Sequence, residues 1–284
     1  MRGSKFIVAL ALAAALLGAG QAGAAGPAGA SGPAAQIGPW PVAATGRVQV
    51  SLGGSWVWDE GFKDAIQTAV ISGQGASQAL ARDLRFEDDR WWLLRVAYGL
   101  HPRLTAHLTL GQVEGGRLWQ GLPSGEWSAV LRPSLVYGGG LSGLVWQGPQ
   151  GWGVRAGLEY LRYDNRGIAT WYAPDGTPTE SYGSSATGQV DYWRLSGGAV
   201  LYKTWGCLTP WAGLSLAHAQ FKENDRDANN LDATVIDYDF ASKSEDIVGA
   251  MAGLNWQARP DLSLGIMANF LNRDEVGLML SYGF

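Results

Sequence analysis

Apolar residues recur at every second position in ten segments of this chain, and this period restricts the fold more than any other feature. A two-residue period puts alternate side chains on opposite faces of a β-strand, whereas a helix repeats about every 3.6 residues. In residues 91–100, for example, Trp92, Leu94 and Val96 share one face, while Arg95 lies on the other. The ten segments are 46–58, 91–100, 104–111, 132–146, 152–163, 190–202, 208–219, 247–257, 262–271 and 276–284.

The connections between these segments alternate in length. Short turns lie near 101–103, 148–151, 203–206 and 259–261, and longer polar stretches lie at 59–89, 112–131, 164–189 and 220–246. The last outer connection, 272–275, is short. Short turns that alternate with long loops on an even number of strands are typical of transmembrane β-barrels. We therefore predict an all-β fold, a single transmembrane antiparallel β-barrel of about ten strands over 46–284, with eight or twelve strands as alternatives.

A soluble β-sandwich or a lipocalin-like barrel could share this period, but its bulky apolar face would point inward. Here the polar face consists of Gly, Ser, Thr and a few Arg, and the chain holds 41 Gly in all. Such small residues suit a narrow lumen, so we expect the bulky face to meet lipid. Tryptophans near the strand ends suit the interface between lipid and water. They are Trp56, Trp58, Trp91, Trp92, Trp152, Trp193, Trp205, Trp211 and Trp256.

The N-terminal residues 1–24 are typical of a secretory signal peptide. Arg2 and Lys5 precede an apolar run over 6–17, and Ala22-Gly23-Ala24 forms a small-residue cleavage site. The alternative is an uncleaved membrane anchor. We predict Sec-type export with cleavage after Ala24, followed by a flexible periplasmic tail, rich in Ala, Gly and Pro, over 25–45.

The last nine residues, 276–284, place apolar side chains at alternate positions and end in the aromatic Phe284. This ending resembles the terminal signature of Gram-negative outer-membrane barrels. The segments 98–104, 152–160 and 208–214 resemble strands and turns of small OmpA/OmpX-like barrels, which often have eight strands. The resemblance implies an outer-membrane location and contact with outer-membrane lipid and lipopolysaccharide. It also implies that the barrel-assembly machinery recognises the C-terminal strand through Phe284 and Tyr282.

Charged residues on the polar face are candidates for the lumen, as a pore lining or as a plug. They are Arg47, Arg95, Arg132, Arg155, Glu159 and Arg194. The excess of Arg over Glu indicates a pore that favours anions. Buried charges need partners, however, so the same residues also fit a filled lumen in which Arg pairs with Glu159 or with loop acids such as Asp191. Because side chains already just fill an eight-stranded barrel, we favour a narrow or plugged lumen.

Two further features of the sequence bear on metal binding and catalysis. The spacing Asp225-x-Asp227-x-Asn229 matches the first ligands of a calcium loop, but Asn230 and Ile236 break the pattern at the positions that need Gly and Glu. We therefore expect a solvated acidic loop over 220–246. The three histidines are His101, His107 and His218, and none belongs to an Asp-x-His or Ser-His-acid arrangement. We predict no metal site, no cofactor and no enzyme activity.

Composition excludes other classes. With 21 basic against 25 acidic residues, the chain is unsuited to binding nucleic acid. The single cysteine, Cys207, cannot form an intramolecular disulfide. We predict a monomeric integral outer-membrane barrel of structural or surface-interaction type. A small anion-favouring diffusion channel is the alternative, and a hydrolase at the barrel rim is a third hypothesis.

Overall fold

The computed structural model describes residues 34–37, 39–72, 75–182, 184–186, 188–229 and 235–284. The expected signal peptide, 1–24, and the first part of the expected tail, 25–33, lie outside these residues. In the described part, the helical segments are two short 3-10 turns, η1 (Pro149–Gly151) and η2 (Thr179–Tyr182). None of the described helices has the length and apolar character that crossing a membrane requires.

Ten strands form a closed antiparallel ring, which confirms the predicted all-β barrel and its strand segments. In ring order they are β3 (Val48–Gly61), β5 (Gly75–His101), β6 (Leu104–Leu122), β8 (Ser134–Gln147), β9 (Trp152–Tyr172), β11 (Gln189–Lys203), β12 (Leu208–Asn229), β14 (Val248–Arg259), β15 (Leu262–Phe270) and β16 (Asp274–Gly283). The pairing of β16 with β3, from Gly283 opposite Gln49 to Asp274 opposite Asp59, closes the ring. The closed ring leaves none of the ten strands with an unpaired edge over this part of the barrel.

The outer surface of this ring is a continuous apolar belt. Its leucines are exposed by amounts from 38% at Leu104 to 73% at Leu108. The others are Leu52, Leu94, Leu100, Leu110, Leu135, Leu141, Leu158, Leu195, Leu201, Leu208, Leu214, Leu216, Leu264, Leu278 and Leu280. A soluble protein rarely exposes so much apolar surface, so the belt is the lipid-facing side of a transmembrane barrel. Aromatic rings lie at its outer edge, where Tyr160 stacks on Trp193 and His218 contacts the same indole.

The predicted tryptophan positions are confirmed only in part. Trp56, Trp92, Trp205 and Trp256 lie on the outer surface, with 39% to 53% of their area exposed. The prediction is wrong for Trp91 and Trp211. These two side chains point into the barrel and are only 2% and 4% exposed.

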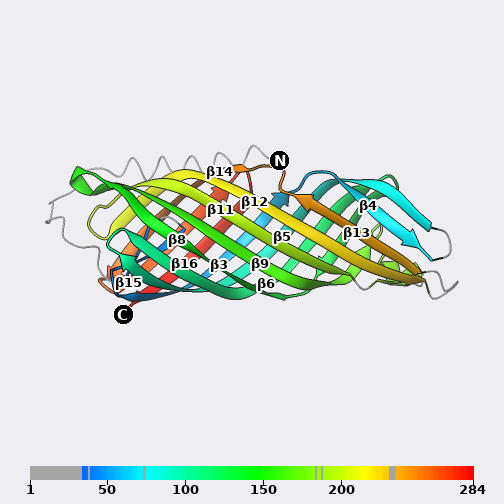
Figure 1. Cartoon of the computed structure of the whole chain (residues 1–284), viewed down its shortest axis with the longest axis horizontal. Helices are drawn as coiled ribbons and strands as arrows, with labels where there is room; N and C mark the ends of the chain where they lie inside the picture. The colour runs from blue at the N-terminus through cyan, green and yellow to red at the C-terminus, as the bar shows by residue number, and fades with distance from the viewer. Residues whose placement is uncertain (1–33, 38, 73–74, 183, 187, 230–234) are drawn as a thin grey trace.

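Beyond the belt the barrel continues as a narrower extension. Three strands that lie within sequence stretches expected to be loops form it together with the long ring strands: β4 (Ala65–Ile71), β7 (Gly125–Leu131) and β13 (Val235–Lys243). Here β7 takes the place of β8, while β4 and β13 take the place of β3, β16, β15 and β14. The extension is thus a closed ring of eight strands, β5-β6-β7-β9-β11-β12-β13-β4. Figure 1 shows β4 and β13 at the end opposite the C-terminus.

The extension reverses the polarity of the membrane part. Its outer surface carries ion pairs such as Arg85 with Glu126 and Arg226 with Asp237. Its interior is a hydrophobic cluster, here called the outer core, made of aliphatic and aromatic side chains from all eight of its strands, with Val57 of β3, Phe62 and Val136 of β8. The aromatic members are Phe62, Phe86, Trp91, Tyr163, Trp171, Tyr192, Phe221 and Phe240. The two-residue period did not predict this reversal, because each strand was expected to end at the membrane surface.

A short hairpin lies inside the opposite end of the barrel. Strands β1 (Ala34–Ile37) and β2 (Trp40–Ala43) pair with each other, and the Val42 amide donates to Gln49 Oε1 on the barrel wall. The indole of Trp40 is 3% exposed and packs on Gly157, where a Cβ atom would come within 2.5 Å of the ring. Part of the segment expected to be a flexible tail, 34–45, therefore has structure within the barrel.

Candidate functional site

The middle of the lumen contains a bidentate ion pair between opposite walls. Arg95 on β5 donates from Nε to Glu159 Oε1 at 2.9 Å and from Nη2 to Glu159 Oε2 at 3.2 Å. His107 Nε2 lies 3.4 Å from Glu159 Oε1, and Thr109 donates to the same oxygen at 3.3 Å. All four side chains are buried. The arrangement matches the filled-lumen interpretation, in which an arginine pairs with Glu159.

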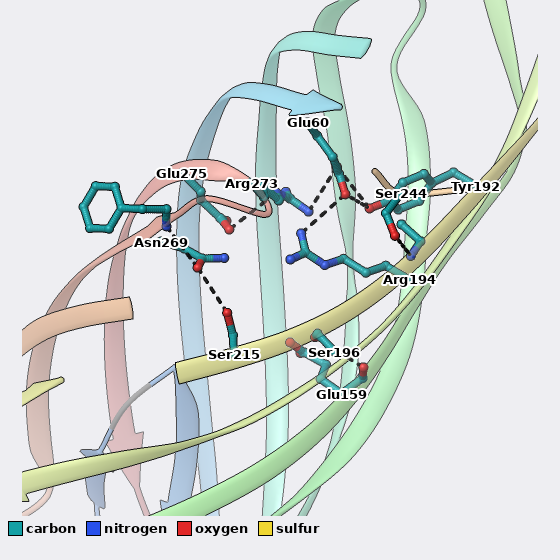
Figure 2. A network of polar contacts seen from close by, with 12 residues as sticks. Glu60, Glu159, Tyr192, Arg194, Ser196, Ser215, Ser244, Asn269, Arg273 and Glu275 are labelled. Carbon is teal, nitrogen blue, oxygen red and sulfur yellow. Dashed lines mark hydrogen bonds and ion pairs between the residues drawn. The ribbon is translucent and has the colours of Figure 1, made fainter. Parts of the chain in front are cut away.

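A second cluster lies around Glu60 (Figure 2) and includes Tyr192, a member of the outer core. Arg194 Nη1 and Arg273 Nη1 approach the Glu60 carboxylate to 3.6 and 3.8 Å from two sides. Tyr192 donates its hydroxyl to Glu60 Oε1 at 2.9 Å, and Arg273 Nε lies 3.5 Å from Glu275 Oε2. Arg273 reaches the lumen because the turn between β15 and β16 folds inward, with Leu271 at a φ of 78°. One carboxylate thus holds two strands and a turn together.

A third pair, Asp89 and Arg166, joins β5 to β9. Arg166 Nη2 donates to Asp89 Oδ1 at 2.9 Å, and Nη1 donates to Oδ2 at 3.2 Å. The same guanidinium donates to the carbonyl oxygens of Gly115 and Arg132. Arg166 is fully buried. Because a charge removed from water is stable only with partners of this kind, the pair indicates a part of the lumen that is closed to solvent.

These charged groups lie between two apolar closures. On the outer side, Phe221 packs edge-on against Phe62, Phe86 and Phe240, with ring centroids 4.8 to 5.5 Å apart. On the other side, a smaller cluster is formed by Trp40, Val42, Val200, Tyr202, Trp211 and Met251. The cavity between them measures about 90 Å³, which is room for a few water molecules. Arg95, Arg194 and Arg273 line it.

Arg155, on β9, differs from the other arginines in the lumen. It is 4% exposed, and its closest hydrogen-bond partner is Ser142 Oγ at 3.5 Å. Within the described part of the chain it forms no ion pair, and its Nε has no hydrogen-bond partner. In the described structure, the interior near β2 therefore holds a positive charge without a carboxylate partner, unlike the other arginines of the lumen.

The structure brings together four of the six residues that the sequence placed in the lumen. Arg95, Arg155, Glu159 and Arg194 lie inside and are buried. Arg47 and Arg132 are exposed and do not join them. Arg47 precedes β3 at the rim, and Arg132 lies in the connection between β7 and β8. Neither residue therefore lies within the lumen, where strands would surround its side chain.

Four charges were missed: Glu60 and Arg273 of the second cluster, and the pair of Asp89 and Arg166. The inward orientation of Glu223 and Asp225 was missed as well. All lie in stretches expected to be outer loops. Alternation alone could not assign their faces, because irregularities shift the inward side from odd to even positions. Residues 164 and 165 face one residue of β11, with Asn165 at a φ of 51°. The inward face therefore passes from Tyr163 to Arg166.

The histidines do not assemble a hydrolytic site in the described structure. His107 faces Glu159 and Arg95 within the lumen, and His101 is exposed at a turn. His218 lies on the outer surface of the barrel against Trp193, with ring centroids 5.4 Å apart. None of the three has a serine or an aspartate as a hydrogen-bond partner in a triad geometry among the described residues.

The remaining predicted residues lie at the two ends of the barrel. Asp225, Asp227 and Asn229 belong to β12, where they pair with β13 or β10, rather than to a loop. Phe284 donates its backbone amide to the Val48 carbonyl at 2.9 Å, and its ring packs against Tyr282. Both aromatic rings are exposed at the edge of the belt. Cys207 is a free, exposed thiol in the turn before β12.

Comparisons with known proteins agree with this class of fold. No protein-family model and no curated protein sequence matches the chain. OprG from Pseudomonas aeruginosa is 11% identical with a TM-score of 0.40, over 85% of this chain and 97% of OprG. The outer-membrane protease OmpT from Escherichia coli is 12% identical with a TM-score of 0.46, over 83% of this chain and 97% of OmpT.

An outer-membrane channel from Pseudomonas putida F1 is 12% identical with a TM-score of 0.35, over 88% of this chain and 100% of the channel. These values assign neither a family nor an activity. The class rests on the closed ring and the apolar belt. The chain therefore has the fold of an outer-membrane β-barrel, which confirms the class-level resemblance.

Proposed function

We propose that this barrel does not conduct solutes and acts through its outer surface, as a structural or surface-interaction protein of the outer membrane. The observation that carries this proposal is the outer core. Its members Phe86, Leu118 and Phe221 are at most 1% exposed, so the eight-stranded extension is filled across its interior. Water and ions need a continuous polar path, and a buried apolar core that fills the interior offers none.

The ion pairs and the N-terminal hairpin support the same conclusion. Arg95 with Glu159 crosses the lumen below the outer core, and Asp89 with Arg166 crosses it among the members of that core. The hairpin β1–β2 fills the opposite end. Removal of the hairpin alone should leave the barrel closed, because the outer core lies beyond it.

Conductance in planar bilayers tests this proposal. We expect no stable current steps from the wild-type protein or from a variant that lacks 34–43. A triple variant, Phe86→Ala, Phe221→Ala and Tyr192→Ala, in the hairpin-deleted chain should conduct and serves as the positive control. Stable steps from the wild-type barrel would contradict the proposal.

An anion-favouring channel is the second candidate, and Arg155 is the observation that favours it. A buried guanidinium without a carboxylate partner makes the hairpin end of the lumen positive. If wild-type steps do appear, a reversal potential that shows anion preference and is lost in Arg155→Gln would support this candidate.

A rim hydrolase has no comparable support, since His218 lies on the outer surface against Trp193. That the protein is not an enzyme stays a prediction. Protease and lipase assays of the purified barrel test it.

A further inference from the structure

Two acidic residues in the extension are buried without a partner of opposite charge. Glu223 and Asp225 alternate on β12 beyond the apolar belt, and both point into the barrel. Glu223 is 1% exposed, and neither of its carboxylate oxygens has a hydrogen-bond partner. Asp225 is 8% exposed, and its Oδ1 also lacks a partner. The lumen acids differ, because Glu60, Asp89 and Glu159 each contact at least one arginine.

The neighbouring strands present apolar and neutral side chains to this pair. Val190 on β11 and Phe240 on β13 are the residues opposite Glu223. Tyr238 lies opposite Asp225, whose carboxylate approaches Gly188. The bases closest along β12, Lys222 and Arg226, alternate to the outer surface.

Both of these bases are paired on that surface. Lys222 lies 3.7 Å from Asp239, and Arg226 lies 3.8 Å from Asp237. The sequence of β12 thus places bases outward and acids inward at adjacent positions. The two buried carboxylates have no counter-charge among the described residues.

Buried carboxylates of this kind cannot remain ionised alone. An ionised group in an apolar environment costs so much free energy that it is paired, bound to a cation or protonated. Burial raises the pKa of Glu223 well above its ordinary value, and the negative charge of Asp225 adds to the effect. At the outer end of the barrel, beyond the belt, dissolved cations are available to satisfy both groups.

We propose that Glu223 and Asp225 together bind one divalent cation of the Mg²⁺ or Ca²⁺ class. Two carboxylates balance a charge of two, whereas a monovalent ion would leave one of them uncompensated. Oxygen ligands without nitrogen or sulfur select hard cations. Among the described residues no third acidic, histidine or cysteine side chain completes a metal-binding group, so waters fill the other positions. Mg²⁺ in particular is commonly held by one or two carboxylates and keeps several waters.

This pair is not the calcium-loop pattern considered from the sequence. That pattern joined Asp225 to Asp227 and Asn229, and it requires a tight loop. These residues instead continue β12, with Asp227 opposite both Ile236 of β13 and Ala186 of β10 (Ser184–Ala186). The inferred site uses Glu223 instead. It is the next inward-facing residue of β12 toward the membrane, and it is more buried than Asp225.

Terbium luminescence of the whole chain, refolded in detergent without lipopolysaccharide, tests the proposal. Trp171 and Tyr238 lie beside Asp225, so their excitation should sensitise a bound Tb³⁺. We expect a saturable signal from one ion per chain that millimolar Ca²⁺ or Mg²⁺ displaces. Glu223→Gln and Asp225→Asn should each weaken Tb³⁺ binding at least tenfold. Asp237→Asn, on the outer face of the neighbouring strand, should change it less than twofold.

Heat-modifiable migration on a gel checks that each variant is folded, and both amide variants keep the size of the native side chain. The absence of a saturable signal in the wild-type protein would overturn the proposal. So would equal binding by folded Glu223→Gln, which would place the ion on the acidic outer surface. A stabilisation by acid that Ca²⁺ and Mg²⁺ cannot reproduce at neutral pH would show that protons alone neutralise the pair.

Discussion

The buried pair of Asp89 and Arg166 provides a direct test of whether the lumen is closed. Asp89→Ala removes the carboxylate and leaves the guanidinium, which is fully buried, with the carbonyl oxygens of Gly115 and Arg132 and the ring of Tyr163 but no counter-charge. Removal of one member of a buried ion pair costs about 3 to 5 kcal/mol of unfolding free energy. We therefore expect Asp89→Ala to lose that amount.

Two further variants distinguish the loss of this ion pair from a nonspecific loss of stability. In the double variant Asp89→Ala, Arg166→Met no charge is left unpaired, so it should lose less than Asp89→Ala alone. Glu87→Ala removes a partner of Arg85 on the surface of the extension, where the side chains are 31% and 27% exposed. A solvent-screened pair of this kind contributes about 1 kcal/mol or less.

Urea unfolding in lipid vesicles, followed by tryptophan fluorescence, measures these free energies. The midpoint and the slope are fitted together, because a changed slope would mean that the folded or unfolded state has changed in compactness. If Asp89→Ala costs no more than Glu87→Ala, water reaches Arg166. The lumen would then be open at this level, and the reasoning behind a plugged barrel would be refuted.

Three further predictions follow from the extension and from the opposite end of the barrel. Phe221→Ala should cost about 3 to 5 kcal/mol in the same assay, because the ring is fully buried among three phenylalanines. In EDTA, the contribution of Glu223 to stability should be greatest below pH 4.5, its ordinary pKa, and should be lost as pH rises through its raised folded-state pKa; the difference between the wild-type and Glu223→Gln pH profiles isolates it. Asp225 and Tyr238 are the titratable groups that face Glu223, and Glu223→Gln should flatten the profile. Cys207 should react with an impermeant maleimide only after the outer membrane is permeabilised, because its turn lies at the periplasmic end of the barrel, with the chain termini. Labelling of Cys207 in intact cells would show that the barrel has the opposite orientation in the membrane.

Alternation predicted the ten membrane strands because lipid and lumen place opposite demands on adjacent residues. Along β6, for example, Leu108 and Leu110 face outward while His107 and Thr109 face inward, as the period indicates. The four lumen residues Arg95, Arg155, Glu159 and Arg194 could be assigned for the same reason. Each lies in a regular stretch of strand within the belt.

The extension could not be predicted in this way. Residues 59–89 and 220–246 are polar on average, since the outer surface of the extension is charged, and they were therefore expected to be loops. Irregular positions at Asp83, Asp88 and Asn165, all with positive φ, interrupt the period where the strands leave the membrane. The pairing of Arg166 with Asp89 also joins residues 77 positions apart, which no local pattern encodes.

The reversal of polarity along β5 also fixes the height of the protein in its membrane. Between residues 92 and 100 the bulky apolar side chains at even positions point outward, whereas Leu84, Phe86 and Trp91 point inward. A shift inward by two residues along a strand, about 7 Å, would carry Arg90 and Arg162 toward the hydrocarbon. The cost of each charge would rise with its depth, from about 0 to 1 kcal/mol near the interface toward about 2 to 4 kcal/mol at the midplane, and a shift outward would bring the belt leucines into water. The barrel is therefore vertically anchored, and the extension projects a constant distance above the lipid.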